Sequence, residues 1–154
     1  MARGKKPLLE NIEIKKIAAE GKSIAYVDEK VLFVPNTVPG DIVDVQVTRK
    51  RKSFLEGFIV NVRKYSDIRT EPFCSHFGVC GGCKWQNLPY QLQTEFKQQE
   101  IVDNLQRIGK VELQNVSPII GSPKTTYYRN KLEYTFCNKR FLTREEIANG
   151  QDID

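Results

Sequence analysis

Residues 41–63 read D-I-V-D-V-Q-V-T-R-K-R-K-S-F-L-E-G-F-I-V-N-V-R and decide the fold expected for the first part of the chain. Val43, Val45 and Val47 alternate with other residues at a period of two, which is typical of a strand with one buried face. A second strand is predicted over residues 54–63. The stretch therefore predicts two β-strands joined by a short basic connection.

Three further strands are expected upstream of this stretch. They cover residues 9–16, 23–27 and 31–34, each short and rich in apolar residues. A Pro-Gly pair at 39–40 breaks the chain before the fourth strand. Five antiparallel strands within residues 1–66 predict an OB-like β-barrel, because closing the sheet hides the strand edges of so short a chain.

A run of four cations lies between the predicted fourth and fifth strands, formed by Arg49, Lys50, Arg51 and Lys52. In OB folds this connection is one of the loops that contact oligonucleotides, and clustered cations favour a phosphate backbone. A solvated turn that keeps the barrel soluble explains the same run. The net charge of +5 alone indicates only mild attraction to polyanions.

Tyr26 and Phe54 are further candidates for RNA contact, since aromatic rings stack on unpaired bases. At strand positions an aromatic residue is more often part of a core.

Three short motifs in this region resemble the TRAM domain, a small RNA-binding barrel found in RNA-modifying enzymes. They are E-G-K-S-I-A at 20–25, V-L-F-V-P at 31–35 and P-G-D at 39–41. Each is weak evidence alone, but their order and spacing ahead of a cysteine-rich stretch are specific. The resemblance implies that the barrel binds RNA.

The cysteine-rich stretch contains Cys74, Cys80 and Cys83 in a C-x5-C-x2-C spacing. Cysteines spaced this closely, in a chain without a secretion signal, are expected to bind metal rather than to form disulfides. Tetrahedral coordination needs a fourth ligand. The alternatives are His76, which would complete a zinc site but lies too near in sequence for an unstrained arrangement, Cys137, and a cysteine outside this chain.

The run P-x-C-x-H-F-G-x-C-G-G-C at 72–83 resembles the iron-sulfur stretch of the RNA uracil-C5 methyltransferases that act on ribosomal RNA. The resemblance implies that the three cysteines hold a [4Fe-4S] cluster, with the fourth ligand further toward the C-terminus. Cys137 is then expected to be a buried core thiol. Lys84 and Trp85, directly after the cysteines, are expected RNA contacts. A structural role is expected for the cluster, since no radical-chemistry motif is present.

Residues 89–154 are expected to begin a central α/β domain. Pro89 is suited to the first turn of a helix, which Gly109 ends, and residues 127–142 predict one or two strands. The helix is expected to be a packing element.

Within this segment the run Y-R-N-K-x-E-Y-T-F resembles the start of the central RNA-binding domain of the same methyltransferases. Arg129, Asn130 and Lys131 are therefore candidate RNA contacts, with a salt-bridged sheet surface as the alternative.

The expected fold class is therefore α+β, with an OB-like barrel over 1–66, a cysteine loop over 67–88 and an incomplete central domain over 89–154. No nucleophile, base or Gly-rich turn for S-adenosylmethionine is recognisable. The resemblance covers the N-terminal portion of the family, whose catalytic domain this chain lacks. The chain alone is expected to bind RNA without methylating it.

The expected function is RNA binding within an S-adenosylmethionine-dependent 23S ribosomal RNA uracil-C5 methyltransferase. The alternatives are a stand-alone RNA-binding module with a zinc knuckle and the homologous transfer RNA uracil-C5 methyltransferase. No stretch is long and apolar enough for a membrane span, and no secretion signal is visible. The protein is expected to be cytoplasmic and monomeric.

Overall fold

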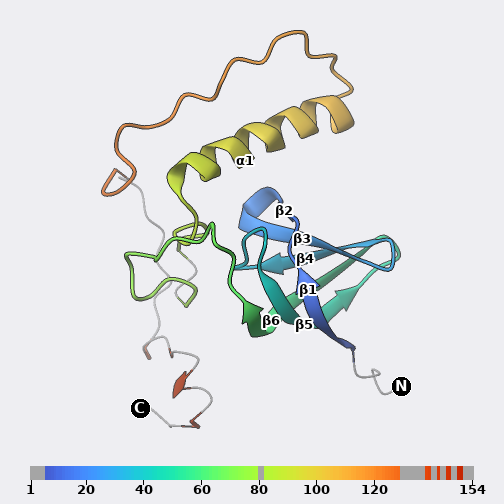
Figure 1. Ribbon diagram of the computed structural model, residues 1–154, viewed down its shortest axis with the longest axis vertical. Helices are drawn as coiled ribbons and strands as arrows, with labels where there is room; N and C mark the ends of the chain where they lie inside the picture. The colour runs from blue at the N-terminus through green and yellow to red at the C-terminus, as the bar shows by residue number, and fades with distance from the viewer. Residues whose placement is uncertain are drawn as a thin grey trace.

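The computed structural model describes residues 6–79 and 82–128, together with 138, 139, 142, 145, 146, 149 and 150. A curled β-sheet over residues 8–64 lies beside one long helix, α1 (Tyr90–Asp103), and an extended segment runs back along that helix (Figure 1). Among the described residues no helix has the length and apolar character that crossing a membrane requires.

Six strands form the sheet, in the order β1-β5-β6-β4-β3-β2. Their bounds are β1 (Leu8–Glu13), β2 (Lys16–Ile17), β3 (Lys22–Val27), β4 (Lys30–Pro35), β5 (Ile42–Lys50) and β6 (Phe54–Lys64). The two outer strands, β1 and β2, are successive parts of one stretch of chain. Between them Ile14 N–H donates to the Asp41 carbonyl, and Lys15 N–H donates to the Ile24 carbonyl. The sheet therefore curls until both of its edges meet on residues 8–17, and we call this curled sheet over residues 8–64 the barrel.

The five predicted strands are confirmed, with the first divided into β1 and β2. The prediction that all of them pair antiparallel is wrong, because β4 and β6 are parallel, with Val31 opposite Phe54. The turn over residues 36–41 carries the chain across to the β1 side of the sheet. β6 is antiparallel to β5 and so returns in the direction of β4.

The core lies inside this curled sheet. Its buried side chains are apolar. Ile14 lies between β1 and β2, and the others come from alternate positions of the strands: Ala25, Leu32, Val34, Val43, Val45, Val47 and Leu55. Each large member contributes roughly 1.5–3 kcal/mol by leaving water. Gly57 allows β6 to lie close to β5, because a Cβ there would lie 2.4 Å from Val45 Cγ1 and 2.7 Å from the Gln46 carbonyl.

Helix α1 begins after Pro89, as predicted, and passes into a π-helical turn, η2 (Asn104–Ile108), before Gly109. Neither element has a buried residue. The Gln98 amide joins the helix to the returning segment, donating to the Ser117 carbonyl at 3.1 Å and accepting from Ile119 N–H at 3.0 Å. The strands predicted over 127–142 lie mostly outside the described residues.

Candidate nucleic-acid interface and cysteine loop

An aromatic face, formed by Tyr26, Phe33 and Phe54, lies on the outside of β3, β4 and β6. These side chains alternate along their strands with the buried ones, so they point away from the core. The register places Tyr26 across from Val31, which lies across from Phe54. The rings of Phe33 and Phe54 meet edge to face with centroids 5.9 Å apart, and Tyr26 is 57% exposed. The structure therefore places these aromatic residues outside the core.

The four-cation run lies at the end of this face but is not all loop. β5 extends to Lys50, so Arg49 and Lys50 belong to the strand and only residues 51–53 connect it to β6. The prediction of a four-residue basic loop is therefore wrong in its bounds, because Arg49 pairs across the sheet with Glu56. Its guanidinium lies 5.9 Å from the centroid of the Phe54 ring and 3.5 Å from a Glu56 carboxylate oxygen.

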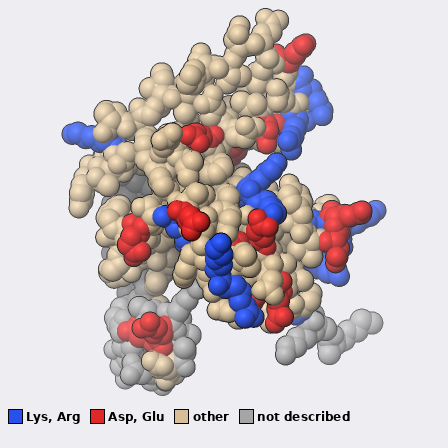
Figure 2. All heavy atoms as spheres, viewed as in Figure 1, with Lys and Arg blue, Asp and Glu red and all other residues tan. Residues whose placement is uncertain are grey.

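Lys50, Arg51 and Lys52 are exposed and form what we call the basic turn. Arg51 N–H donates to the Phe54 carbonyl at 2.8 Å, which closes the turn beside the aromatic face. On the face drawn in Figure 2, Lys and Arg side chains are interspersed with Asp and Glu. Among the ion pairs of the described residues, Lys22 Nζ lies 3.5 Å from a Glu20 carboxylate oxygen. Exposed ion pairs of this kind are worth little, so such a cation exchanges its partner for a phosphate at small cost.

The cysteine loop brings the backbone of Cys74 and the sulfur of Cys83 to one glutamine, Gln86. Cys74 is half-buried and Cys83 is exposed, and both are free. Gln86 accepts a hydrogen bond from Cys74 N–H at 3.2 Å and donates one to the Cys83 sulfur at 3.1 Å. His76 is exposed, with Nδ1 3.3 Å from the Ser75 hydroxyl. The two ends of the loop are therefore held together by a single side chain.

Within the described residues no three potential metal ligands are grouped, and Cys80 and Cys137 are not among those residues. The donor chemistry present does fit a metal centre. Free thiols are soft ligands suited to iron-sulfur clusters and to zinc, and an amide N–H directed at a sulfur is the outer-shell contact that such ligands commonly have.

The cysteine loop contacts the barrel at Gly21, whose φ is +71°. A Cβ on Gly21 would lie 2.6 Å from Lys84 Cβ and 3.0 Å from Trp85 Nε1. Trp85 is half-buried here, and Lys97 Nζ lies 5.5 Å from its ring centroid. Its indole N–H has no hydrogen-bond partner among the described residues. The predicted RNA contact Trp85 thus packs between the barrel and α1.

A cleft of about 380 Å³ opens beside this contact, between the barrel and the cysteine loop. Lys22 and Lys84 line it from the two sides, together with Cys83. Lys84 is therefore placed at a surface that both parts share. The other predicted RNA contacts, Arg129, Asn130 and Lys131, lie outside the described residues.

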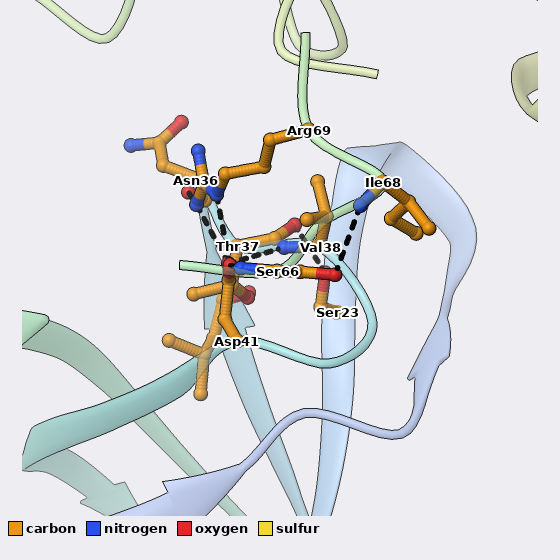
Figure 3. A network of polar contacts seen from close by, with 9 residues as sticks. Ser23, Asn36, Thr37, Val38, Asp41, Ser66, Ile68 and Arg69 are labelled. Carbon is orange, nitrogen blue, oxygen red and sulfur yellow. Dashed lines mark hydrogen bonds and ion pairs between the residues drawn. The ribbon is translucent and has the colours of Figure 1, made fainter. Parts of the chain in front are cut away.

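Asp41 anchors the linker that leads to the cysteine loop (Figure 3). Its carboxylate is fully buried and accepts from Arg69 Nε at 2.8 Å and from Arg69 Nη2 at 2.6 Å. It also accepts from the backbone N–H groups of Val38 and Ser66. The P-G-D motif is therefore a structural joint. Sequence reasoning did not find Arg69, because a single arginine in a polar linker carries no sign of a buried partner elsewhere in the chain.

The known proteins to which this chain is similar agree with its resemblance to the TRAM domain and to RNA methyltransferases. Residues 10–60 match the model of the TRAM domain. The chain is 56% identical over 138 residues to an uncharacterized RNA methyltransferase of Bacteroides thetaiotaomicron, covering 90% of this chain and 30% of that protein. It is 42% identical over 118 residues to the 23S rRNA (uracil(1939)-C(5))-methyltransferase of Acidithiobacillus ferrooxidans, covering 77% and 27%.

Among solved structures, the chain is similar to that of the Pyrococcus abyssi tRNA (uracil-54, C5)-methyltransferase in complex with S-adenosyl-L-homocysteine. The identity is 26% and the TM-score 0.45, covering 75% of this chain and 24% of that one. The chain thus spans about 30% of the length of two curated relatives, although the match covers 90% or more of the chain itself. The predicted resemblance to the TRAM domain and to RNA methyltransferases is confirmed.

Proposed function

We propose that this chain is the RNA-binding portion of an S-adenosylmethionine-dependent RNA uracil-C5 methyltransferase whose substrate is 23S ribosomal RNA. The observation that carries the proposal is the aromatic face beside the basic turn, within residues that match the TRAM domain. The curled sheet serves as an OB-type barrel, and in such barrels this kind of strand face and loop hold oligonucleotides.

The aromatic face and the basic turn divide the work of RNA binding. Tyr26 is exposed and can stack on an unpaired base, while Phe33 supports Phe54 from the side. The exposed cations of the basic turn neutralise phosphates of the same strand and release their counterions. Arg49, held between Phe54 and Glu56, keeps the turn next to the rings. The arrangement suits single-stranded RNA, because duplex bases offer no free ring face.

We propose that methyl transfer is carried out by residues other than those that the structure describes. Attack on uracil needs a nucleophile, a base and a pocket for S-adenosylmethionine, which we assign to other parts of a longer protein like the relatives above. Cys74, Cys80 and Cys83 are proposed to bind a [4Fe-4S] cluster that ties the cysteine loop together. Zinc in a stand-alone RNA-binding module is the competing proposal, since the same thiols suit it.

RNA binding is tested with a fluorescent uridine-rich single strand and two charge-matched variants. Changing Lys50, Arg51 and Lys52 to alanine should weaken binding and flatten its dependence on salt, by a slope of about 0.7 for each phosphate that is no longer neutralised. The control changes Arg107, Lys110 and Lys124 to alanine, which removes the same charge from the helix side. Tyr26→Ala should cost about 1–3 kcal/mol of binding free energy by removing a stacking partner.

Equal losses in the basic-turn variant and the control would show that only net charge attracts the RNA, and would overturn the proposed site. The cofactor is tested separately, by anaerobic purification followed by visible absorbance and analysis for iron, sulfide and zinc. Iron with acid-labile sulfide supports the cluster. Zinc without sulfide would replace the cluster proposal with the zinc module.

A further inference from the structure

Gln86 makes two hydrogen bonds that join the ends of the cysteine loop. Its Oε1 accepts from Cys74 N–H at 3.2 Å, and its Nε2 donates to the Cys83 sulfur at 3.1 Å. The two cysteines are the first and last of the C-x5-C-x2-C spacing. One amide thus connects the backbone of the first cysteine to the sulfur of the last.

The orientation of this amide follows from the backbone. Cys74 N–H is a donor only, so the atom of Gln86 that faces it must be the carbonyl oxygen. The amino group of Gln86 is then the end that faces Cys83. A swap of oxygen and nitrogen would set two donors against each other at Cys74, so the N–H to sulfur contact follows from the chemistry of both partners.

A hydrogen bond from an amide N–H to a cysteine sulfur changes how that sulfur binds a metal. It withdraws electron density from the sulfur and fixes the direction of the Cβ–S bond. In metal centres with thiolate ligands, hydrogen bonds to the sulfurs tune both binding and reduction potential. Gln86 is not itself a candidate ligand, but its amide N–H would have both of these effects on the Cys83 sulfur.

We propose that Gln86 is a positioning residue for the metal centre of the cysteine loop, acting through an N–H donated to the Cys83 ligand. The inference rests on the proposed cysteine site and adds a residue to it. The acceptor end aligns the backbone of Cys74, and the donor end tunes the Cys83 sulfur. The two ends predict separate effects, one on the structure of the loop and one on the electronic character of the ligand.

The probe is Co²⁺, titrated anaerobically into the purified chain, because thiolate-to-cobalt charge transfer reports directly on the sulfur. Gln86→Met keeps the length of the side chain but has no amide. It should bind Co²⁺ about tenfold more weakly. Its charge-transfer band should move to longer wavelength, because a sulfur without its hydrogen bond gives up electron density more easily.

The matched control is Gln93→Met. Gln93 donates to the carbonyls of Trp85 and Leu88 at 3.0 and 2.7 Å, in the segment that follows the cysteines, and neither bond involves a sulfur. This variant should lose thermal stability while its charge-transfer band stays at the wild-type wavelength. A merely structural role of Gln86 would make the two variants alike.

The inference is overturned if the band of Gln86→Met stays at the wild-type wavelength, if Gln93→Met shifts it equally, or if the wild-type chain shows no thiolate-to-cobalt band. Iron and sulfide analysis of the same wild-type preparation distinguishes the failure of the proposed cluster. A wild-type chain that takes Co²⁺ with the expected band but never takes up iron and sulfide would end the cluster proposal and leave the role of Gln86 standing.

Discussion

The barrel and the helical segment formed by α1 and η2 differ in how completely they bury their apolar side chains. In the barrel, side chains such as Leu32 and Val45 are completely buried. In α1 and η2 no residue is buried, and Ile101 of α1 and Ile108 of η2 are 56% and 79% exposed despite a spacing that suits one face of a helix. The comparison teaches that apolar spacing predicts that a helix forms, whereas its stability depends on what packs against it. Among the described residues, the free energy of folding is concentrated in residues 8–64 and in the linker that they hold.

The largest effect is expected at the joint between the barrel and that linker. Arg69→Met would leave Asp41 buried without its cation, and breaking a buried pair in this way costs about 3–5 kcal/mol. The control is Arg63→Met, since the Arg63 side chain is 48% exposed and its buried partner Asp44 keeps hydrogen bonds from Asn11 and Asn61. Urea unfolding followed by circular dichroism measures both. Similar losses in the two variants would show that burial does not distinguish the Asp41 pair.

The next prediction compares the effect on stability of removing an apolar side chain from the barrel core and from α1. Leu32→Ala removes a completely buried side chain from the barrel core and should reduce the free energy of unfolding by about 2–5 kcal/mol. Ile101→Ala changes a side chain that is already 56% exposed on α1, so a change within about 0.5 kcal/mol is expected. If Ile101→Ala destabilised the chain as strongly as Leu32→Ala, the helix would contribute to the same cooperative unit as the barrel.

The strands were predictable because each carries its own alternating pattern. Val43, Val45 and Val47 mark the inner face of β5 without any knowledge of their partners. Pairing was less predictable. The parallel contact of β4 with β6 depends on where the chain crosses after β4, and no local pattern records that crossing. Arg49 was assigned to a loop because a cation beside other cations gives no sign of the cross-strand Glu56 that extends β5.

The candidate site likewise has some features that the sequence predicts and others that depend on the folded structure. The cysteine spacing and the basic run are local and were visible in the sequence. The bonds of Arg69 to Asp41, 28 residues apart, and the outward direction of Phe33 depend on the folded sheet. Gln86 was close to the cysteines in sequence, but its two hydrogen bonds follow from turns whose geometry the residue types alone do not set.

The smallest expected effect concerns the pH dependence of the barrel through Asp44. The backbone N–H of Asn11, which lies 3.0 Å from Asp44 Oδ1, is the main cause that lowers the pKa of this carboxyl below its ordinary value of 3.8. Hydrogen bonds from Asn61 and Arg63 act in the same direction, while burial opposes them. Asn11 has a φ of +55° at the irregularity in the β1–β5 register, and this turns its N–H toward the carboxylate.

A lowered native pKa means that the folded state favours the ionised carboxylate. The resulting stability is fully present above the unfolded pKa of about 4 and is lost as the pH falls through the lower native value. Asp44→Asn removes the ionisable group, so the urea midpoints of wild type and variant should differ by a constant amount at neutral pH and converge below about pH 4. A gap that stayed the same down to about pH 2 would contradict this assignment, because the contribution of Asp44 would then come from its shape rather than its charge. Since this contact joins β1 to β5 within the barrel, convergence would also show that the edge at which the sheet closes is stabilised by a titratable group, unlike the apolar core that it encloses.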